Sequence, residues 1–164
     1  MATFADLKLT HRIFMQNYPF SRYAITDNPC IKLAKPLSKC KFALVTTAGL
    51  RLETDTPFSH STTNKLGDCS FREISNDVQV QNLFEDHTSS SFDHSGVEAD
   101  KNLALPIERF RELVANKTIS SLNHRSFSFM GSIIAPNKLI KETAPQVAKL
   151  LKEDAVDCVF LAPV

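Results

Sequence analysis

Two short, continuously apolar segments constrain the fold of this chain more than any other feature. Phe42–Val45 is one of them, and the other lies within residues 156–164. Neither segment alternates between apolar and polar residues, as a strand with one solvated face would. Unbroken apolar runs of this length are typical of strands buried on both faces, which belong to parallel sheets covered by helices. The sequence therefore predicts an α/β fold, with a mostly parallel sheet flanked by helices in a single layered domain.

Helix patterns supply the predicted layers around this sheet. Residues 106–114 place Ile107, Phe110, Leu113 and Val114 on one helical face, with Pro106 in the first turn where its missing N–H is tolerated. Residues 137–153 also have a helical pattern, which Pro145 interrupts. Either this helix kinks, or one helix ends and a second begins at Thr143 with a capping box; we favour the second interpretation. Polar and apolar residues alternate over residues 126–131, which end in glycine, and this pattern predicts a strand and a turn.

The start of the chain has a different pattern. Apolar residues within 4–17 predict an amphipathic helix that Pro19 limits. Residues 19–41 contain three prolines and predict an extended lead-in lying across the fold. We therefore divide the chain into residues 1–40, a helix and lead-in, and residues 41–164, the sheet and its helices.

Charge and cysteine content exclude several classes of protein. The chain has 19 basic and 18 acidic residues, so its net charge produces no positive field that would attract nucleic acid or anionic lipid. It has no run approaching the roughly 20 apolar residues that span a bilayer, and it does not begin like a signal peptide, so we expect a cytoplasmic protein. The four cysteines form no CxxC pair and are expected to be reduced thiols. They are Cys30, Cys40, Cys69 and Cys158.

Small polar residues follow the first predicted strand. Thr46, Thr47 and Gly49 come directly after Phe42–Val45. Ligands of open α/β sheets bind beyond the carboxyl ends of the strands, so these residues are candidates for ligand binding. An ordinary strand-to-loop turn is the alternative interpretation.

Residues 85–102 are the most polar stretch of the chain. His87 and Asp93 could form an acid–base pair, because an imidazole oriented by a carboxylate transfers protons near pH 7. Alternatively, Ser91, Asp93 and Asn102 hold the loop through bonds from side chain to backbone. The spacing of acidic residues and histidines matches no recognised set of metal ligands, so we predict no metal site. The chain also lacks the Gly-x-Ser-x-Gly, Walker and Rossmann motifs.

Several blocks of the second half, in one order, resemble a known family. Residues 100–114 are similar to the pattern D-x-N-x-x-x-P-[LI]-x-R-[LF]-R-E-L-V of selenoprotein B of the glycine, sarcosine, betaine and D-proline reductases. His87, Ser91 and Asp93 resemble a polar element of that family. Further similar blocks are residues 119–122, 126–131, 142–145 and 152–157. With Gly131 at the end of one block, the candidate ligand-binding residues are Thr46, Thr47, Gly49, Ser91, Asn102 and Gly131.

The resemblance implies reductive cleavage of a C–N bond in a small amino acid or its N-methyl derivative. It implies a selenocysteine or cysteine redox centre directly after the terminal strand, a partner subunit carrying a pyruvoyl group, and a thioredoxin-type electron donor. Selenium or sulfur is suited to this role because the deprotonated selenol or thiol is the nucleophile, and this form exists at neutral pH. Because no such motif lies within residues 1–164, we expect a chain truncated at that motif and inactive alone. A UGA codon after the Val164 codon would support this expectation.

Three interpretations of function stay open at this point. The first is the truncated reductase component, whose status as an enzyme the sequence leaves undecided. The second is a non-catalytic module of the same fold that binds a small ligand or a partner. The third is a free-standing enzyme that uses His87. An apolar strand at the end of a sheet also predicts self-association into a homo-oligomer.

Overall fold

The computed structural model describes residues 7–17, 31–59, 66–89 and 92–164. The chain divides into two compact units, residues 1–32 and residues 33–164. In the first unit the described element is helix α1 (Leu9–Asn17), which confirms a helix within residues 4–17. Most of the predicted lead-in falls on residues 18–30, outside the described part. Among the described residues no helix has the length and apolar character needed to cross a bilayer.

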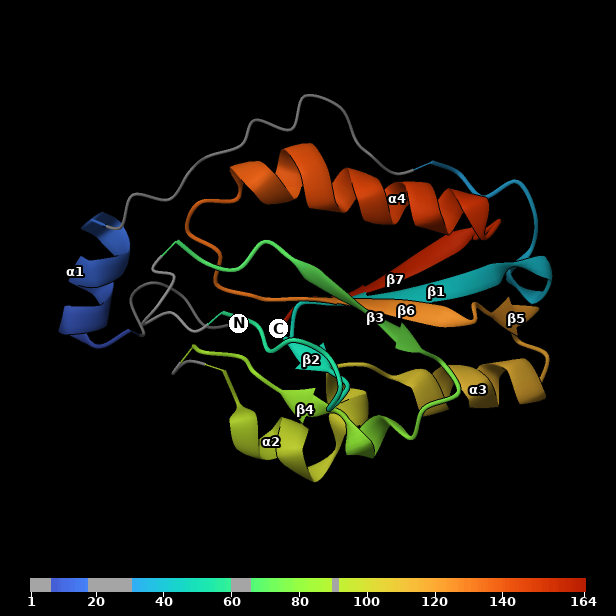
Figure 1. Cartoon of the computed structure of the whole chain (residues 1–164), viewed down its shortest axis with the longest axis horizontal. Helices are drawn as coiled ribbons and strands as arrows, with labels where there is room; N and C mark the ends of the chain where they lie inside the picture. Colours follow the sequence, from blue (N-terminus) through green and yellow to red (C-terminus); the bar gives the residue numbers. More distant parts are fainter. Residues whose placement is uncertain (1–6, 18–30, 60–65, 90–91) are drawn as a thin grey trace. The chain divides into compact units, whose positions relative to one another are not determined.

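The second unit is built on a five-stranded sheet with β1 near its centre (Figure 1). β7 pairs in parallel with β1, with Phe42 opposite Cys158 and Thr46 opposite Ala162. β5 and β6 pair in parallel with the other side of β1, and β3 closes that side antiparallel to β6. The strands of the sheet are β1 (Lys41–Thr46), β3 (Phe71–Ser75), β5 (Ser121–Leu122), β6 (Arg125–Phe129) and β7 (Cys158–Ala162). The predicted mostly parallel α/β sheet is confirmed.

Helices cover both faces of this sheet (Figure 1). α3 (Ile107–Ala115) buries Ile107 and Phe110 against one face, in a cluster that includes Leu44 of β1. α4 (Ala144–Glu153) buries Val147 against the other face, in a cluster that includes Val45 of β1. Neighbouring residues of β1 thus point into different cores, which is why the Phe42–Val45 run is apolar throughout.

Shorter elements complete the fold around one end of the sheet. β2 (Leu50–Arg51) and β4 (Phe84–Glu85) form a small antiparallel pair, and α2 (His94–Ala99) follows β4. Single 3₁₀ turns are formed by Leu37–Lys39, Val80–Asn82 and Lys101–Leu103.

The helix before β7 corrects one expectation. A π-helical turn (Leu139–Thr143) runs directly into α4, so the helical backbone does not stop at Thr143. Thr143 has helical φ and ψ, and its hydroxyl donates to Cys69 O at 2.7 Å instead of capping α4. The predicted capping box is therefore wrong, although Pro145 does lie in the first turn of α4. A wide turn at this point accommodates a proline that a regular helix interior would not.

β7 corrects a second expectation. It is a strand of the parallel sheet as predicted, but it lies at the edge and is not buried on both faces. Val159, Phe160 and Leu161 are 40, 42 and 67% exposed. Within the described residues, β1 is the only strand paired with β7, so the outer side of β7 is uncovered there.

An ion pair fastens α4 to the sheet at the amino end of β6. Arg125 Nε and Nη2 donate to the two carboxylate oxygens of Asp154 at 2.8 and 2.9 Å. The buried Asn123 side chain donates to the same carboxylate at 2.9 Å. These donors, Arg125 first, outweigh desolvation and lower the pKa of Asp154 to about 2. The carboxylate therefore holds the end of α4 against the start of β6.

Candidate functional site

The carboxyl ends of β1 and β7 are tied together by two threonines. Thr47 Oγ1 accepts from Val164 N at 3.0 Å and lies 3.2 Å from Val164 O, to which its hydroxyl donates. Thr46 Oγ1 accepts from Ala48 N at 3.2 Å and donates to Ala162 O at 3.3 Å. The predicted ligand-binding residues Thr46 and Thr47 thus lie at the expected edge, where Thr46 binds the last residue of β7 and Thr47 binds the segment that follows it.

Two glycines allow the backbone and His87 to approach one another at this edge. Gly49 has φ +65°, a left-handed conformation that favours glycine, and a Cβ on it would lie 3.3 Å from His87 N. A Cβ on Gly131, which follows β6, would lie 2.5 Å from His87 Nε2 and 3.0 Å from Thr47 O. The predicted residues Thr47, Gly49 and Gly131 therefore meet around His87.

His87 is buried, with 6% of its surface exposed. Its ring stacks on Phe92 with centroids 4.3 Å apart, and its Nδ1 accepts from Ser89 N at 3.3 Å. Because Nδ1 accepts, the proton of the neutral ring is assigned to Nε2. Desolvation lowers the pKa of His87, against the opposing charge of Glu85, so the neutral form is favoured near pH 7. Nε2 has no hydrogen-bond partner among the described residues.

The hydrogen bonds of Asp93 and Glu85 differ from the predicted pairing of Asp93 with His87. Asp93 Oδ1 caps α2, accepting from Gly96 N at 3.1 Å and Ser95 Oγ at 2.9 Å. Those bonds, with Gly96 first, lower the pKa of Asp93. Among the described residues no hydrogen bond joins Asp93 to His87, so the proposed acid–base pair is not hydrogen-bonded in this structure. A catalytic role for either residue stays a prediction.

Glu85 is the carboxylate that contacts both histidines of this segment, and the sequence analysis missed it. Its Oε2 lies 2.7 Å from His94 Nδ1, and its Oε1 accepts from the backbone N–H of His87. The bond to Glu85 raises the pKa of His94. The pairing of Glu85 with His94 had no signal beyond their common position in the polar stretch.

Asn102 and Ser91 complete the predicted ligand-binding set. Asn102 Oδ1 accepts from Glu108 N at 3.1 Å, and its Nδ2 donates to Asp100 Oδ1 at 3.0 Å. Asn102 therefore ties the turn before α3 to that helix, as the loop-holding alternative predicted. Ser91 lies outside the described residues.

A cavity of about 270 Å³ lies beside the His87 cluster. It shares Phe92 with the imidazole stack and Val164 with the surroundings of Gly131. Its lining residues are Phe92, Asp93, Gly96, Val97, Leu103 and Val164. The cavity is therefore mostly apolar with one carboxylate, at the edge where α/β proteins bind ligands.

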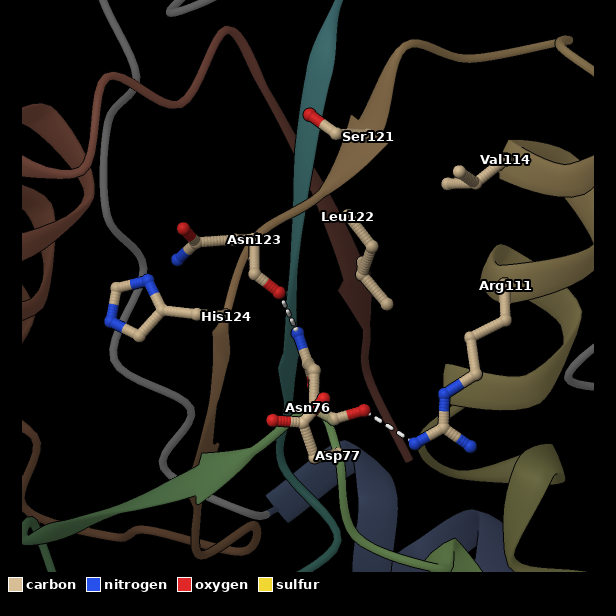
Figure 2. A pocket seen from close by; sticks show the side chains of 8 residues that line it. All are labelled: Asn76, Asp77, Arg111, Val114, Ser121, Leu122, Asn123 and His124. Carbon is tan, nitrogen blue, oxygen red and sulfur yellow. Dashed lines mark hydrogen bonds between the residues drawn. The ribbon is translucent and has the colours of Figure 1, made fainter.

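A second hollow, of about 300 Å³, lies at the amino end of β6 (Figure 2). The Arg111 guanidinium there donates to the backbone carbonyls of Asn76 and Val78, and Asn76 Nδ2 donates to Asn123 O at 2.7 Å. Figure 2 shows the His124 ring turned away from Arg111. The polar side chains of Arg111 and Asn76 are already hydrogen-bonded to backbone carbonyls, so we assign this hollow a structural role.

The described part of the chain offers neither a cluster of metal ligands nor an activated thiol. No group of His, Cys, Asp or Glu side chains there could hold a metal ion. Cys40 and Cys69 are buried and reduced, and Cys158 is half-buried in β7. Burial, followed by the neighbouring Cys40, raises the pKa of Cys158, which disfavours its thiolate. Cys30 lies outside the described residues.

Comparison with known proteins agrees with the sequence resemblance. The family model of glycine/sarcosine/betaine reductase selenoprotein B matches residues 7–164. D-proline reductase subunit gamma of Acetoanaerobium sticklandii is 35% identical over 129 residues, which are 79% of this chain and 50% of that protein. The chain thus spans about half the length of this relative, and no solved structure matches it. The chain belongs to the glycine/sarcosine/betaine reductase selenoprotein B family.

Proposed function

We propose that this chain forms the sheet-edge site of a component of an amino-acid reductase, which cleaves a C–N bond of glycine, sarcosine, betaine or D-proline. One observation carries the proposal. In a chain of this family, the residues after β1, β6 and β7 meet around a buried, neutral His87. A site at the carboxyl ends of parallel strands is where an α/β enzyme binds its substrate.

The reaction needs groups that we propose come from elsewhere. A pyruvoyl group on a partner subunit supplies activation of the amine, and a selenocysteine or cysteine supplies the nucleophile. Cys158 is a poor source of that nucleophile because its thiol pKa is raised. We therefore propose a separate chalcogen, no activity for residues 1–164 alone, electrons from a thioredoxin-type donor, and a cytoplasmic location.

A second copy of the chain is the partner that we propose for the outer edge of β7. The strand has no charged residue or proline, the features that protect sheet edges, and its side chains are half exposed. We expect sedimentation velocity of the 164-residue chain to show self-association that rises with concentration. Leu161→Lys should shift the chain toward monomer, whereas Ile134→Lys, at a similarly exposed leucine-sized residue outside β7, should not. A wild-type monomer at every concentration would remove this proposal.

Non-catalytic binding is the second candidate, and the cavity beside Val164 favours it. A protein that only binds a small ligand needs the cavity but no redox group. The two candidates therefore differ in whether amino-acid reduction depends on this gene.

Deletion of the gene tests the proposed function. Extracts of the deleted strain, supplied with a dithiol, should lose consumption of at least one of glycine, sarcosine, betaine and D-proline. A plasmid carrying the intact gene should restore it. Unchanged consumption of all four compounds would contradict the reductase proposal and leave the binding module as the better account.

A further inference from the structure

A closed cycle of hydrogen bonds, which we call the His94 cycle, is formed by Glu85, His87, Ser89 and His94. Glu85 accepts from the backbone N–H of His87 through Oε1, and its Oε2 lies 2.7 Å from His94 Nδ1. His94 Nε2 lies 3.1 Å from Ser89 O, and Ser89 N donates to His87 Nδ1 at 3.3 Å. The cycle therefore joins β4 and the first residue of α2 to both the backbone and the imidazole of His87.

Both ring nitrogens of His94 face oxygen acceptors. The ionised Glu85 carboxylate and the Ser89 carbonyl can accept hydrogen bonds but cannot donate them. A neutral imidazole carries a single N–H, so it would satisfy one of these oxygens and turn a lone pair toward the other. The imidazolium carries an N–H on each nitrogen and satisfies both oxygens. The cycle is therefore complete only when His94 is protonated.

The groups that contact His94 favour its cationic form. The hydrogen bond to Glu85 raises the pKa of His94 above the ordinary 6.5, against a smaller opposing effect of desolvation. Ser89 O and the charge of Asp93 act in the same direction as Glu85. Histidine is the side chain that such shifts move across physiological pH.

The other titratable groups near His94 oppose this charge little. His87, whose ring centroid lies 6.4 Å from that of His94, is favoured in its neutral form because burial lowers its pKa. Glu98 of α2 and Lys101 of the following 3₁₀ turn line the same cavity of about 360 Å³ as His94, and their charges are opposite. The protonation of His94 is thus set mainly by Glu85.

Phe92 links the two imidazoles by a second route. Its ring stacks on His87 with centroids 4.3 Å apart and meets His94 edge-on at 5.0 Å. Phe92 also lines the cavity beside Val164. A movement of His94 would therefore reach both His87 and that cavity.

We propose that protonation of His94 closes the His94 cycle and fixes His87, and that loss of this proton as the pH rises loosens the cluster at the carboxyl end of the sheet. Glu85 is a positioning residue, because it holds His87 by its backbone N–H. That this cluster is the reductase site rests on the proposed function. Because folding raises the pKa of His94, the cycle contributes fully below the unfolded pKa of 6.5 and is lost as the pH rises through the higher folded pKa.

Nuclear magnetic resonance of the isotope-labelled 164-residue chain tests the proposal without turnover. The His94 ring resonances should titrate with a pKa above 6.5. Protection of the His87 and Ser89 amides from hydrogen exchange should fall about 3- to 10-fold through the same midpoint, the equivalent of one net hydrogen bond. His94→Gln should abolish this step in protection, and Glu85→Gln should lower the pKa of His94.

Glu98→Gln is the matched control for Glu85→Gln. It removes the same charge from the same cavity, but the ion pair of His94 in the described chain is with Glu85. The pKa of His94 and the protection of the two amides should therefore stay nearly unchanged in Glu98→Gln.

The possible outcomes separate the His94 cycle from the reductase proposal. A His94 pKa at or below 6.5, equal effects of Glu85→Gln and Glu98→Gln, or amide protection that stays flat through the His94 titration would each overturn the cycle. If reduction nevertheless disappears with the gene, the reductase proposal survives alone. If the cycle titrates as expected but deletion leaves reduction intact, the cycle stands and the reductase proposal fails.

Discussion

Replacing Asp154 with alanine is expected to lower the free energy of unfolding by about 1.5–3 kcal/mol, the contribution of hydrogen bonds to a charged group, because Arg125 keeps a second partner in Glu73 at 2.8 Å. The Asp154 and Arg125 side chains are only 9 and 20% exposed. The substitution also removes an acceptor from Asn123, which is 1% exposed. Urea unfolding at neutral pH measures the loss.

Neighbouring Glu153 provides the matched control. It pairs with Lys149 on the surface of α4, with side chains 54 and 79% exposed. Surface pairs of this kind contribute about 0.3–0.5 kcal/mol, so Glu153→Ala should be nearly neutral. Equal losses in Asp154→Ala and Glu153→Ala would contradict the role assigned to the Arg125–Asp154 pair.

The same pair makes an acid-dependent contribution to stability. The pKa of Asp154 falls from 3.8 to about 2 on folding, so the unfolded chain binds the proton more readily. The contribution is complete above the unfolded pKa and is lost as the pH falls from about 4 toward 2. The difference in stability between wild type and Asp154→Asn should therefore shrink over that range.

The sequence was sufficient to predict the centre of the fold but not its edge. Phe42–Val45 reads as a buried strand because its neighbouring residues enter two different cores. Residues 158–162 have the same composition, yet β7 lies at the edge of the sheet in the described chain. An apolar run indicates that burial of both faces of a strand would be favourable, but it does not indicate which elements cover those faces.

The candidate site was predictable in parts. Thr46 and Thr47 follow from the rule that ligands bind beyond the carboxyl ends of strands, and the structure places them there. The contact of Gly131 with His87 depends on tertiary structure, because β6 must first pair with β1. Asp93 could have been assigned as a helix cap, since Asp before a helical turn favours capping.

Gly131→Ala is expected to disturb the cluster around His87. Its methyl group would lie 2.5 Å from His87 Nε2, and 3.0 and 3.2 Å from the backbone oxygens of Thr47 and Val164. Backbone oxygens held in a sheet cannot shift far, so the His87 imidazole must move to make room for the methyl group. Overpacking of this kind costs about 1–3 kcal/mol of stability. A misplacement of about 1 Å in an active site can lower activity about 100-fold, so under the proposed function the rate of reduction should fall further than the loss of folding explains.

We propose that the cluster around His87, at the carboxyl end of the sheet, is the working site of this family member. The test is the rate of dithiol-dependent amino-acid consumption by the deleted strain, complemented with each variant at equal protein level. His87→Gln and Gly131→Ala should each reduce the rate about 100-fold or more, while His124→Ala, exposed at the opposite end of β6, should match wild type. Wild-type rates in both His87→Gln and Gly131→Ala would contradict the claim.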